Sequence, residues 1–166
     1  MTRKNYKIFA SYSRQDEAIV APLVELIRIS GTNVFRDEDN LKPGDRWVIE
    51  IASAIKRCQV VLVFWCIHSS ASKAVASEYR RGVNLGKRIV PILLDNTAMA
   101  EEIGQYQGID LRSFGPHVQH PRLGFADRPM TQQERELATS RMEQQLRQKM
   151  AVFVRDWLKR NITIDT

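Results

Sequence analysis

Two apolar runs, QVVLVFW at residues 59–65 and RIVPILL at residues 88–94, limit the folds open to this chain more than any other feature. Each run is apolar at almost every position, whereas a strand with one face in water alternates apolar and polar residues. Strands that are apolar on both faces are typical of parallel sheets covered by helices on both sides. The residues between the runs are sufficient for one helix, so we expect a β-α-β unit.

The first 114 residues repeat this alternation of strand and helix. Pro91, inside the second run, indicates a position near a sheet edge or at a bulge. The sequence therefore predicts an α/β fold, a flavodoxin-like open parallel sheet with helices on both faces. The other strands are expected at 6–11, 33–36 and 108–114, and the helices from Asp16 to Ser30, from Trp47 to Arg57 with Asp45 as its cap, and from Ser72 to Leu85 with Gly86 as its stop.

The last third of the chain has a different pattern. Residues 115–130 hold three prolines and two glycines, which predicts an irregular loop. TQQE at 131–134 is a capping box, and apolar residues from Met142 to Leu158 fall on one helical stripe. We therefore divide the chain into a core at 1–114, a loop at 115–130 and a long C-terminal helix within 131–166. This helix either covers the sheet, which we favour, or serves as an assembly arm.

Composition narrows the class of protein. A chain of 166 residues that is 43% apolar can bury the core of one globular domain. No run approaches the roughly 18 consecutive apolar residues of a membrane span, and the start MTRKNYK lacks a signal peptide's apolar segment. We expect a cytoplasmic protein with no membrane partner. The net charge of +6 suggests nucleic-acid binding as a hypothesis. Basic and acidic residues are mixed along the sequence, however, which favours a solvated basic face.

Metal and cofactor motifs are weak. Cys58 and Cys66 are expected to be buried thiols in a reducing compartment, rather than a disulfide or metal pair. His117 and His120 form H-x-x-H without a nearby helical acid, so no metal site is predicted. The absence of a G-x-G-x-x-G loop disfavours dinucleotide binding for hydride transfer.

Ligands of such sheets bind beyond the carboxyl ends of the strands, so the loops after Ser11, Arg36 and Trp65 are expected to form one site. Three segments at this edge, FASYSRQD, VFRDEDNLKPGDRW and SSASKAVASEYRRG, resemble the Toll/interleukin-1 receptor (TIR) domain family, particularly its bacterial NAD-cleaving members. The resemblance covers about residues 5–112, and its most specific part is DEDNLKPGDRW. It implies the TIR fold.

The resemblance also implies an activity. Glu78 stands at the position of the family's essential glutamate and Ser72 at that of its serine, whereas Ala74 stands where many members carry tryptophan. Glu78 is then the catalytic carboxylate that cleaves the nicotinamide–ribose bond of NAD, giving nicotinamide and ADP-ribose or a cyclic isomer. NAD is the substrate, and no cofactor is expected. From the residues alone, Glu78 is instead a surface glutamate paired with Arg81 or Lys73.

Other residues at this edge are candidates for substrate binding. The polar segment after the first strand either lines the nucleotide pocket or forms a turn. The cations after the second strand either meet the pyrophosphate or are solvated. Trp47 either forms a wall of the pocket or anchors its helix in the core. The complete set of candidates is Ser11, Tyr12, Ser13, Arg36, Asp37, Lys42, Trp47 and Ser72.

The family resemblance further implies self-association with other TIR domains through the loop from Asp37 to Arg46. The assembly residues in this loop are Leu41, Pro43, Gly44 and Asp45. The alternative is a non-catalytic adaptor that works by TIR–TIR assembly alone. Nucleic-acid binding through the C-terminal helix is the third and weakest hypothesis. An activating partner protein is also expected, with roles in bacterial defence or in interference with a host both open.

Overall fold

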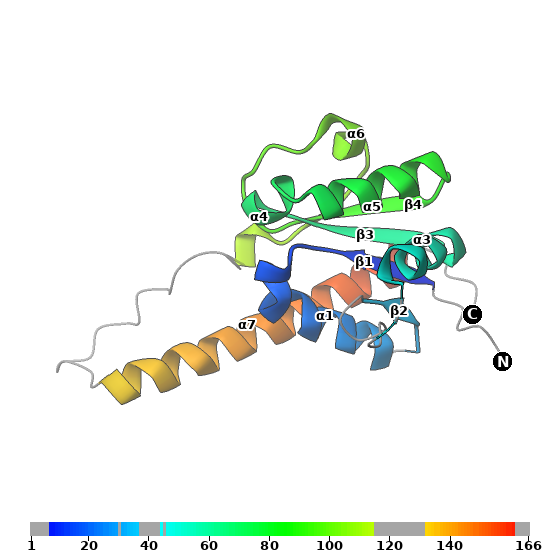
Figure 1. Ribbon diagram of the computed structural model, residues 1–166. Coiled ribbons are helices and arrows are strands. Elements are labelled where there is room, and N and C mark those ends of the chain that lie inside the picture. Colours follow the sequence, from blue (N-terminus) through cyan, green and yellow to red (C-terminus); the bar gives the residue numbers. More distant parts are fainter. Residues whose placement is uncertain (1–6, 30, 37–43, 45, 115–131, 162–166) are drawn as a thin grey trace.

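The computed structural model describes residues 7–29, 31–36, 44, 46–114 and 132–161. One five-stranded parallel sheet, in the order β2-β1-β3-β4-β5, organises these residues (Figure 1). This is the strand order of flavodoxin-like folds, so the predicted fold class is confirmed. The strands are β1 (Ile8–Ser11), β2 (Val34–Phe35), β3 (Val60–Trp65), β4 (Arg88–Leu93) and β5 (Ile109–Asp110).

Strand β3 is the centre of the sheet, and all six of its residues are buried. It pairs with β1 on one side and with β4 on the other. Its alternate side chains enter two separate core clusters, with Val61 and Val63 in one and Leu62 and Phe64 in the other. The uninterrupted apolar run in the sequence is explained by this burial on both faces.

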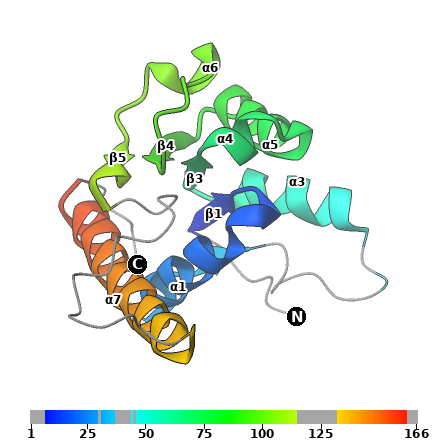
Figure 2. The same cartoon turned by 90° about the vertical axis from the view of Figure 1, so that its left-hand side faces the viewer.

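Helices cover both faces of the sheet (Figures 1 and 2). On one face lie α3 (Trp47–Arg57), α5 (Lys73–Asn84) and the short α6 (Glu101–Gly104). On the other face lie α1 (Glu17–Ile29) and α7 (Gln132–Asn161), which pack side by side. Short helical turns follow three strands: η1 (Arg14–Asp16), α4 (Ile67–Ser70) and η2 (Arg112–Phe114).

Helix α5 lies within one residue of its predicted bounds at both ends. Ser72 is the N-cap, and its Oγ accepts a hydrogen bond from the backbone N–H of Val75 at 3.2 Å. Gly86 follows the helix with a φ of +68°, in the left-handed region that favours glycine. Within the helix, a Cβ at Gly82 would lie 3.0 Å from Cγ2 of Val61. The missing side chain therefore lets α5 approach the sheet closely.

The prediction of a near-edge position for Pro91 is confirmed. Strand β4 is second from the edge, and its pairing with the edge strand β5 begins only at Ile92. Proline has no backbone N–H, and at Pro91 no N–H is needed for pairing with β5. The chain returns close to this point, because a Cβ at Gly108 would lie 2.4 Å from the carbonyl oxygen of Pro91. Glycine is thus required just before β5.

The second half of the C-terminal helix packs against the sheet. Met150, Val154 and Leu158 are buried in the same core cluster as the inward face of α1. The first turns of α7 extend past the end of the sheet (Figure 1). The side chains of Met142 and Leu146, and the predicted loop at 115–130, lie outside the described residues. None of the described helices is long and apolar enough to cross a membrane.

The start of α3 differs from the prediction in two respects. The predicted cap, Asp45, lies outside the described residues, and the N-cap position belongs to Arg46, which makes no side-chain capping bond. The alternative that Trp47 anchors this helix in the core is wrong, since Trp47 is 58% exposed. The side chains that pack toward the sheet begin later in the helix, at the partly buried Ile51, and Ala54 and Ile55 are fully buried.

Candidate functional site

The carboxyl ends of β1 and β3 form the edge where the sequence predicts a site. Ser11, the last residue of β1, pairs with Val63 in the parallel ladder, two residues before β3 ends at Trp65. The chain therefore leaves both strands on the same side, entering η1 after β1 and α4 followed by α5 after β3 (Figure 1).

Glu78 lies in the second turn of α5. The face of this helix that contacts the sheet is formed by Val75, Tyr79 and Gly82, all buried. Glu78 precedes Tyr79 and follows Val75 by three residues, which places it on the flank of that face, and it is half-buried. Tyr79 is fixed edge-on against Trp65, with ring centroids 6.3 Å apart. The carboxylate thus stands between the packed interior and solvent.

The three predicted residues after β1 differ in their access to a ligand. Ser11 is fully buried, and its hydroxyl has no hydrogen-bond partner among the described residues. Tyr12 is buried as well, edge-on to Phe64. Ser13 is half-exposed, and its Oγ accepts a hydrogen bond from the backbone N–H of Gln15 at 3.4 Å as the N-cap of η1. Among these three, Ser13 is the one that reaches the surface.

Arg36 is not the solvated cation that one of the two sequence hypotheses required. It is 8% exposed, and its guanidinium donates to Oε1 of Glu17 at 2.6 Å. This ion pair joins the end of β2 to the start of α1. Ser72 likewise has a structural contact, because its hydroxyl caps α5.

The predicted assembly loop is described at two positions, Gly44 and Arg46. Gly44 is exposed and has a φ of +92°, which favours glycine there. Immediately after the loop, Trp47, Val48 and Ile49 are 58%, 59% and 55% exposed. We call these three exposed apolar side chains in the first turn of α3 the α3 patch. The other predicted residues of the loop, Asp37, Leu41, Lys42, Pro43 and Asp45, lie outside the described residues.

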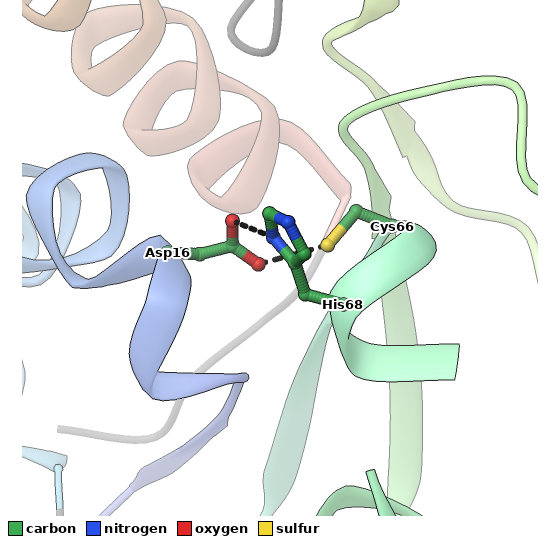
Figure 3. Close-up of side chains that lie close together, drawn as sticks. All are labelled: Asp16, Cys66 and His68. Carbon is green, nitrogen blue, oxygen red and sulfur yellow. Dashed lines mark hydrogen bonds and ion pairs between the residues drawn. The ribbon is translucent and has the colours of Figure 1, made fainter. Parts of the chain in front are cut away.

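The structure also brings together three residues that the sequence analysis did not combine: Asp16, Cys66 and His68 (Figure 3). The Cys66 thiol donates to Oδ2 of Asp16 at 2.8 Å, and Nδ1 of His68 lies 3.0 Å from Oδ1 of the same carboxylate. Asp16 is 2% exposed and Cys66 is fully buried, whereas the His68 side chain is 35% exposed. We call these residues the Asp16 cluster.

Burial, first, and the hydrogen bond to Asp16, second, raise the pKa of the Cys66 thiol to about 11. Burial also raises the pKa of Cys58 to about 11. Both cysteines are free and buried, so the prediction of buried thiols rather than a disulfide is confirmed. The sequence could have indicated this cluster, because Asp16 follows β1 and His68 follows β3, and the carboxyl ends of these two strands lie at the same edge of the sheet.

Together these features define a class of fold, a flavodoxin-like sheet with polar residues at the carboxyl edge of its central strands. The sequence profile described as "TIR domain" matches residues 8–121. The chain belongs to the TIR domain family. A comparison with curated protein sequences finds no match.

Solved structures agree with this fold. The TIR domain of the Toll-related receptor TRR-2 from Hydra magnipapillata superposes with a TM-score of 0.59 at 18% identity, over 64% of this chain and 85% of that one. The TIR domains of the activated Roq1 resistosome, which recognises the pathogen effector XopQ, give a TM-score of 0.50 at 21% identity, over 54% of this chain and 59% of that one. At these identities the similarity establishes the fold alone.

Proposed function

We propose that this TIR domain is an NAD nucleosidase that cleaves the nicotinamide–ribose bond in the cytoplasm, with Glu78 as its catalytic carboxylate. The observation that carries the proposal is the placement of Glu78, half-buried on the flank of α5 at the carboxyl edge of β3. The sequence resemblance also aligns Glu78 with the essential glutamate of NAD-cleaving members of the family. A carboxylate in this setting is close to the apolar interior, where its charge acts more strongly than in water.

The proposed chemistry requires one carboxylate. When the glycosidic bond breaks, its electron pair goes to the pyridinium nitrogen, so nicotinamide leaves as a neutral molecule without protonation. Glycosidases that expel a sugar alkoxide need a second, acidic carboxyl group for this purpose. Glu78 stabilises the positive charge that develops on the ribose. Water then attacks the ribose carbon and releases a proton, giving ADP-ribose, or a nitrogen of the adenine closes a cyclic isomer.

Self-association is the second part of the proposal. The α3 patch exposes Trp47, Val48 and Ile49 directly after the predicted assembly loop. Several large apolar side chains exposed close together in the chain are typical of protein–protein contacts. The expected partner is a second TIR domain, whose loop would complete the substrate site of its neighbour. The same patch would serve a non-catalytic adaptor, which is therefore the alternative function.

The test compares nicotinamide release from NAD by the unmodified chain, Glu78→Ala and a matched control, Glu25→Ala. Glu25 is an exposed helical glutamate on α1, on the other face of the sheet. We expect Glu78→Ala to lower turnover by about 100-fold or more while Glu25→Ala leaves it unchanged. Both variants are expected to remain folded, with stability changed by less than about 1 kcal/mol. Normal turnover by folded Glu78→Ala would contradict the catalytic assignment.

A concentration series separates the two functions. For the nucleosidase, turnover per molecule is expected to rise with protein concentration and to stay flat for Ile49→Asp, which places a charge in the α3 patch. An adaptor would self-associate through the patch and release no nicotinamide at any concentration. Mass spectrometry of the reaction distinguishes linear ADP-ribose from a cyclic product.

A further inference from the structure

We propose that the Asp16 cluster binds a single divalent transition-metal ion of the zinc type, through a carboxylate oxygen of Asp16, Sγ of Cys66 and Nδ1 of His68. The ligand atoms of these three residues all lie within 4.8 Å of one another (Figure 3). The proposal is independent of NAD cleavage and of Glu78. It assigns a new binding site to the ends of β1 and β3.

The distances within the cluster are close to those of a coordination sphere. Bond lengths of about 2.3 Å for Zn–S and about 2.0 Å for Zn–N and Zn–O put neighbouring ligands of a tetrahedral ion about 3.2–3.6 Å apart. The Sγ–Oδ2 and Nδ1–Oδ1 distances are 2.8 and 3.0 Å, as expected while protons bridge these atoms. These two contacts use different oxygens of Asp16. Binding of an ion through one of these oxygens therefore requires the carboxylate to turn and each hydrogen-bonded pair to separate by roughly half an ångström.

The donor set selects the kind of metal. One imidazole, one thiol and one carboxylate form the mixed nitrogen, sulfur and oxygen set that zinc takes in proteins, whereas magnesium and calcium take oxygen ligands. On binding, the Cys66 thiol proton leaves to solvent. The proton on Nδ1 of His68 is exchanged through solvent for one on Nε2, so that His68 coordinates as neutral imidazole. The charges then balance, because the thiolate and the Asp16 carboxylate neutralise a doubly charged ion.

The backbone around the cluster is fixed by hydrogen bonds that do not use the ligand atoms. The Cys66 N–H donates to Oγ of Ser69 at 2.8 Å, and the N–H of Ile67, between two of the ligands, donates to Oδ2 of Asp95 at 2.9 Å. The N–H of Asp16 donates to the Ser13 carbonyl at 2.8 Å. Positioned ligands of this kind reduce the reorganisation that binding requires.

The cluster also combines burial with access. Asp16 and Cys66 are buried, so competition from water at these two ligands is low. The His68 side chain is 35% exposed, which opens a path for the ion and leaves room for a fourth ligand from solvent. Because Asp16 and His68 are 52 positions apart in sequence, a bound ion would join η1 to α4.

The test is a cobalt titration of the untagged full chain after treatment with a chelator. Cobalt bound to a thiolate gives a charge-transfer band that cobalt bound only to nitrogen and oxygen does not give. We expect this band at one equivalent in the unmodified chain, and its displacement by zinc. Zinc is also expected to raise the unfolding temperature, since an ion that binds the folded state stabilises it.

Matched variants identify the ligands. Cys66→Ser is expected to lose the band and about 100-fold in affinity, whereas Cys58→Ser, at the other buried cysteine, retains both. His68→Asn and Asp16→Asn are expected to weaken binding, and the double variant His117→Asn with His120→Asn to leave it unchanged. Equal affinity in unmodified protein and Cys66→Ser, or binding without the band, would overturn the proposal.

X-ray absorption spectroscopy of the zinc-loaded unmodified chain identifies the atoms bound to zinc without a variant, so the proposal remains testable if a variant fails to fold. The expected result is one sulfur at about 2.3 Å and the remaining neighbours at about 2.0 Å. A shell of nitrogen and oxygen alone would exclude Cys66 as a ligand.

Discussion

Replacing Val154 by alanine tests whether α7 belongs to the core in solution. Val154 is 0% exposed and shares a core cluster with Leu23 of α1 and Leu62 of β3. Val152, two positions earlier in the same helix, is 41% exposed. Both changes delete the same atoms and gain the same helix propensity. The difference between them therefore measures burial against the rest of the domain.

The expected magnitude follows from the atoms removed. Val154→Ala deletes the equivalent of two buried CH₂ groups, worth about 0.8 kcal/mol each, and leaves a small cavity that adds to the cost. The better helix propensity of alanine returns about 0.5 kcal/mol. We expect a net loss of about 1.5–2 kcal/mol for Val154→Ala and a change within about 0.5 kcal/mol for Val152→Ala.

Urea unfolding followed by far-ultraviolet circular dichroism measures both values. The buried variant is expected to lower the midpoint without changing the slope of the transition, because the surface exposed on unfolding is nearly the same. In thermal scans the loss corresponds to roughly 4–8 °C. Equal effects of Val154→Ala and Val152→Ala would refute the packing of α7 on α1 and would identify the helix as an arm.

Two further predictions concern charged contacts. Glu17→Gln weakens the contact with the buried guanidinium of Arg36 and is expected to lower the free energy of unfolding in urea by about 1–2 kcal/mol. The control Glu25→Gln, at an exposed ion pair, is expected to lower it by less than about 0.5 kcal/mol. Equal losses in the two variants would contradict the difference in burial. Hydrogen bonds from Arg112 lower the pKa of Asp110 to about 2, so the contribution of this contact is complete above about pH 4 and is lost as the pH falls toward 2. Carbon-13 NMR titration of the Asp110 carboxyl in the folded protein is expected to give this low midpoint and to shift upward in Arg112→Gln. An unchanged midpoint in that variant would contradict the assignment to Arg112.

The sheet could be predicted because its central strands are buried and therefore consist mostly of apolar residues, which are visible in the sequence. β3 is apolar at consecutive positions for the physical reason that helices cover both of its faces, and its observed bounds differ from the predicted run by one residue. Gly86 and Ser72 gave the ends of α5 because their conformational and capping roles are local. Strand positions and helix ends, which depend on residues close together in the sequence, could therefore be predicted without a structure.

The position of a side chain relative to distant elements was not accessible. The periodicity of apolar residues predicts the helix that begins at Trp47. It does not show that the first turn of this helix lies outside the core, with Trp47 exposed. Arg36 was a candidate solvated cation because its partner, Glu17, is 19 positions earlier. Asp16 and Cys66 meet only through the pairing of β1 with β3, and the inward turn of the Asp16 side chain depends on η1.

The cover of the α1 face by α7 has a consequence for the order in which the domain can fold during synthesis. Strands β1, β3 and β4 and helix α1 are all made before residue 105, yet Met150, Val154 and Leu158 of the same cluster are translated later, in α7. A nascent chain that has formed its sheet therefore leaves part of this apolar face, beside α1, open to water until α7 leaves the ribosome. During that interval the chain depends on chaperones or on rapid translation to avoid aggregation.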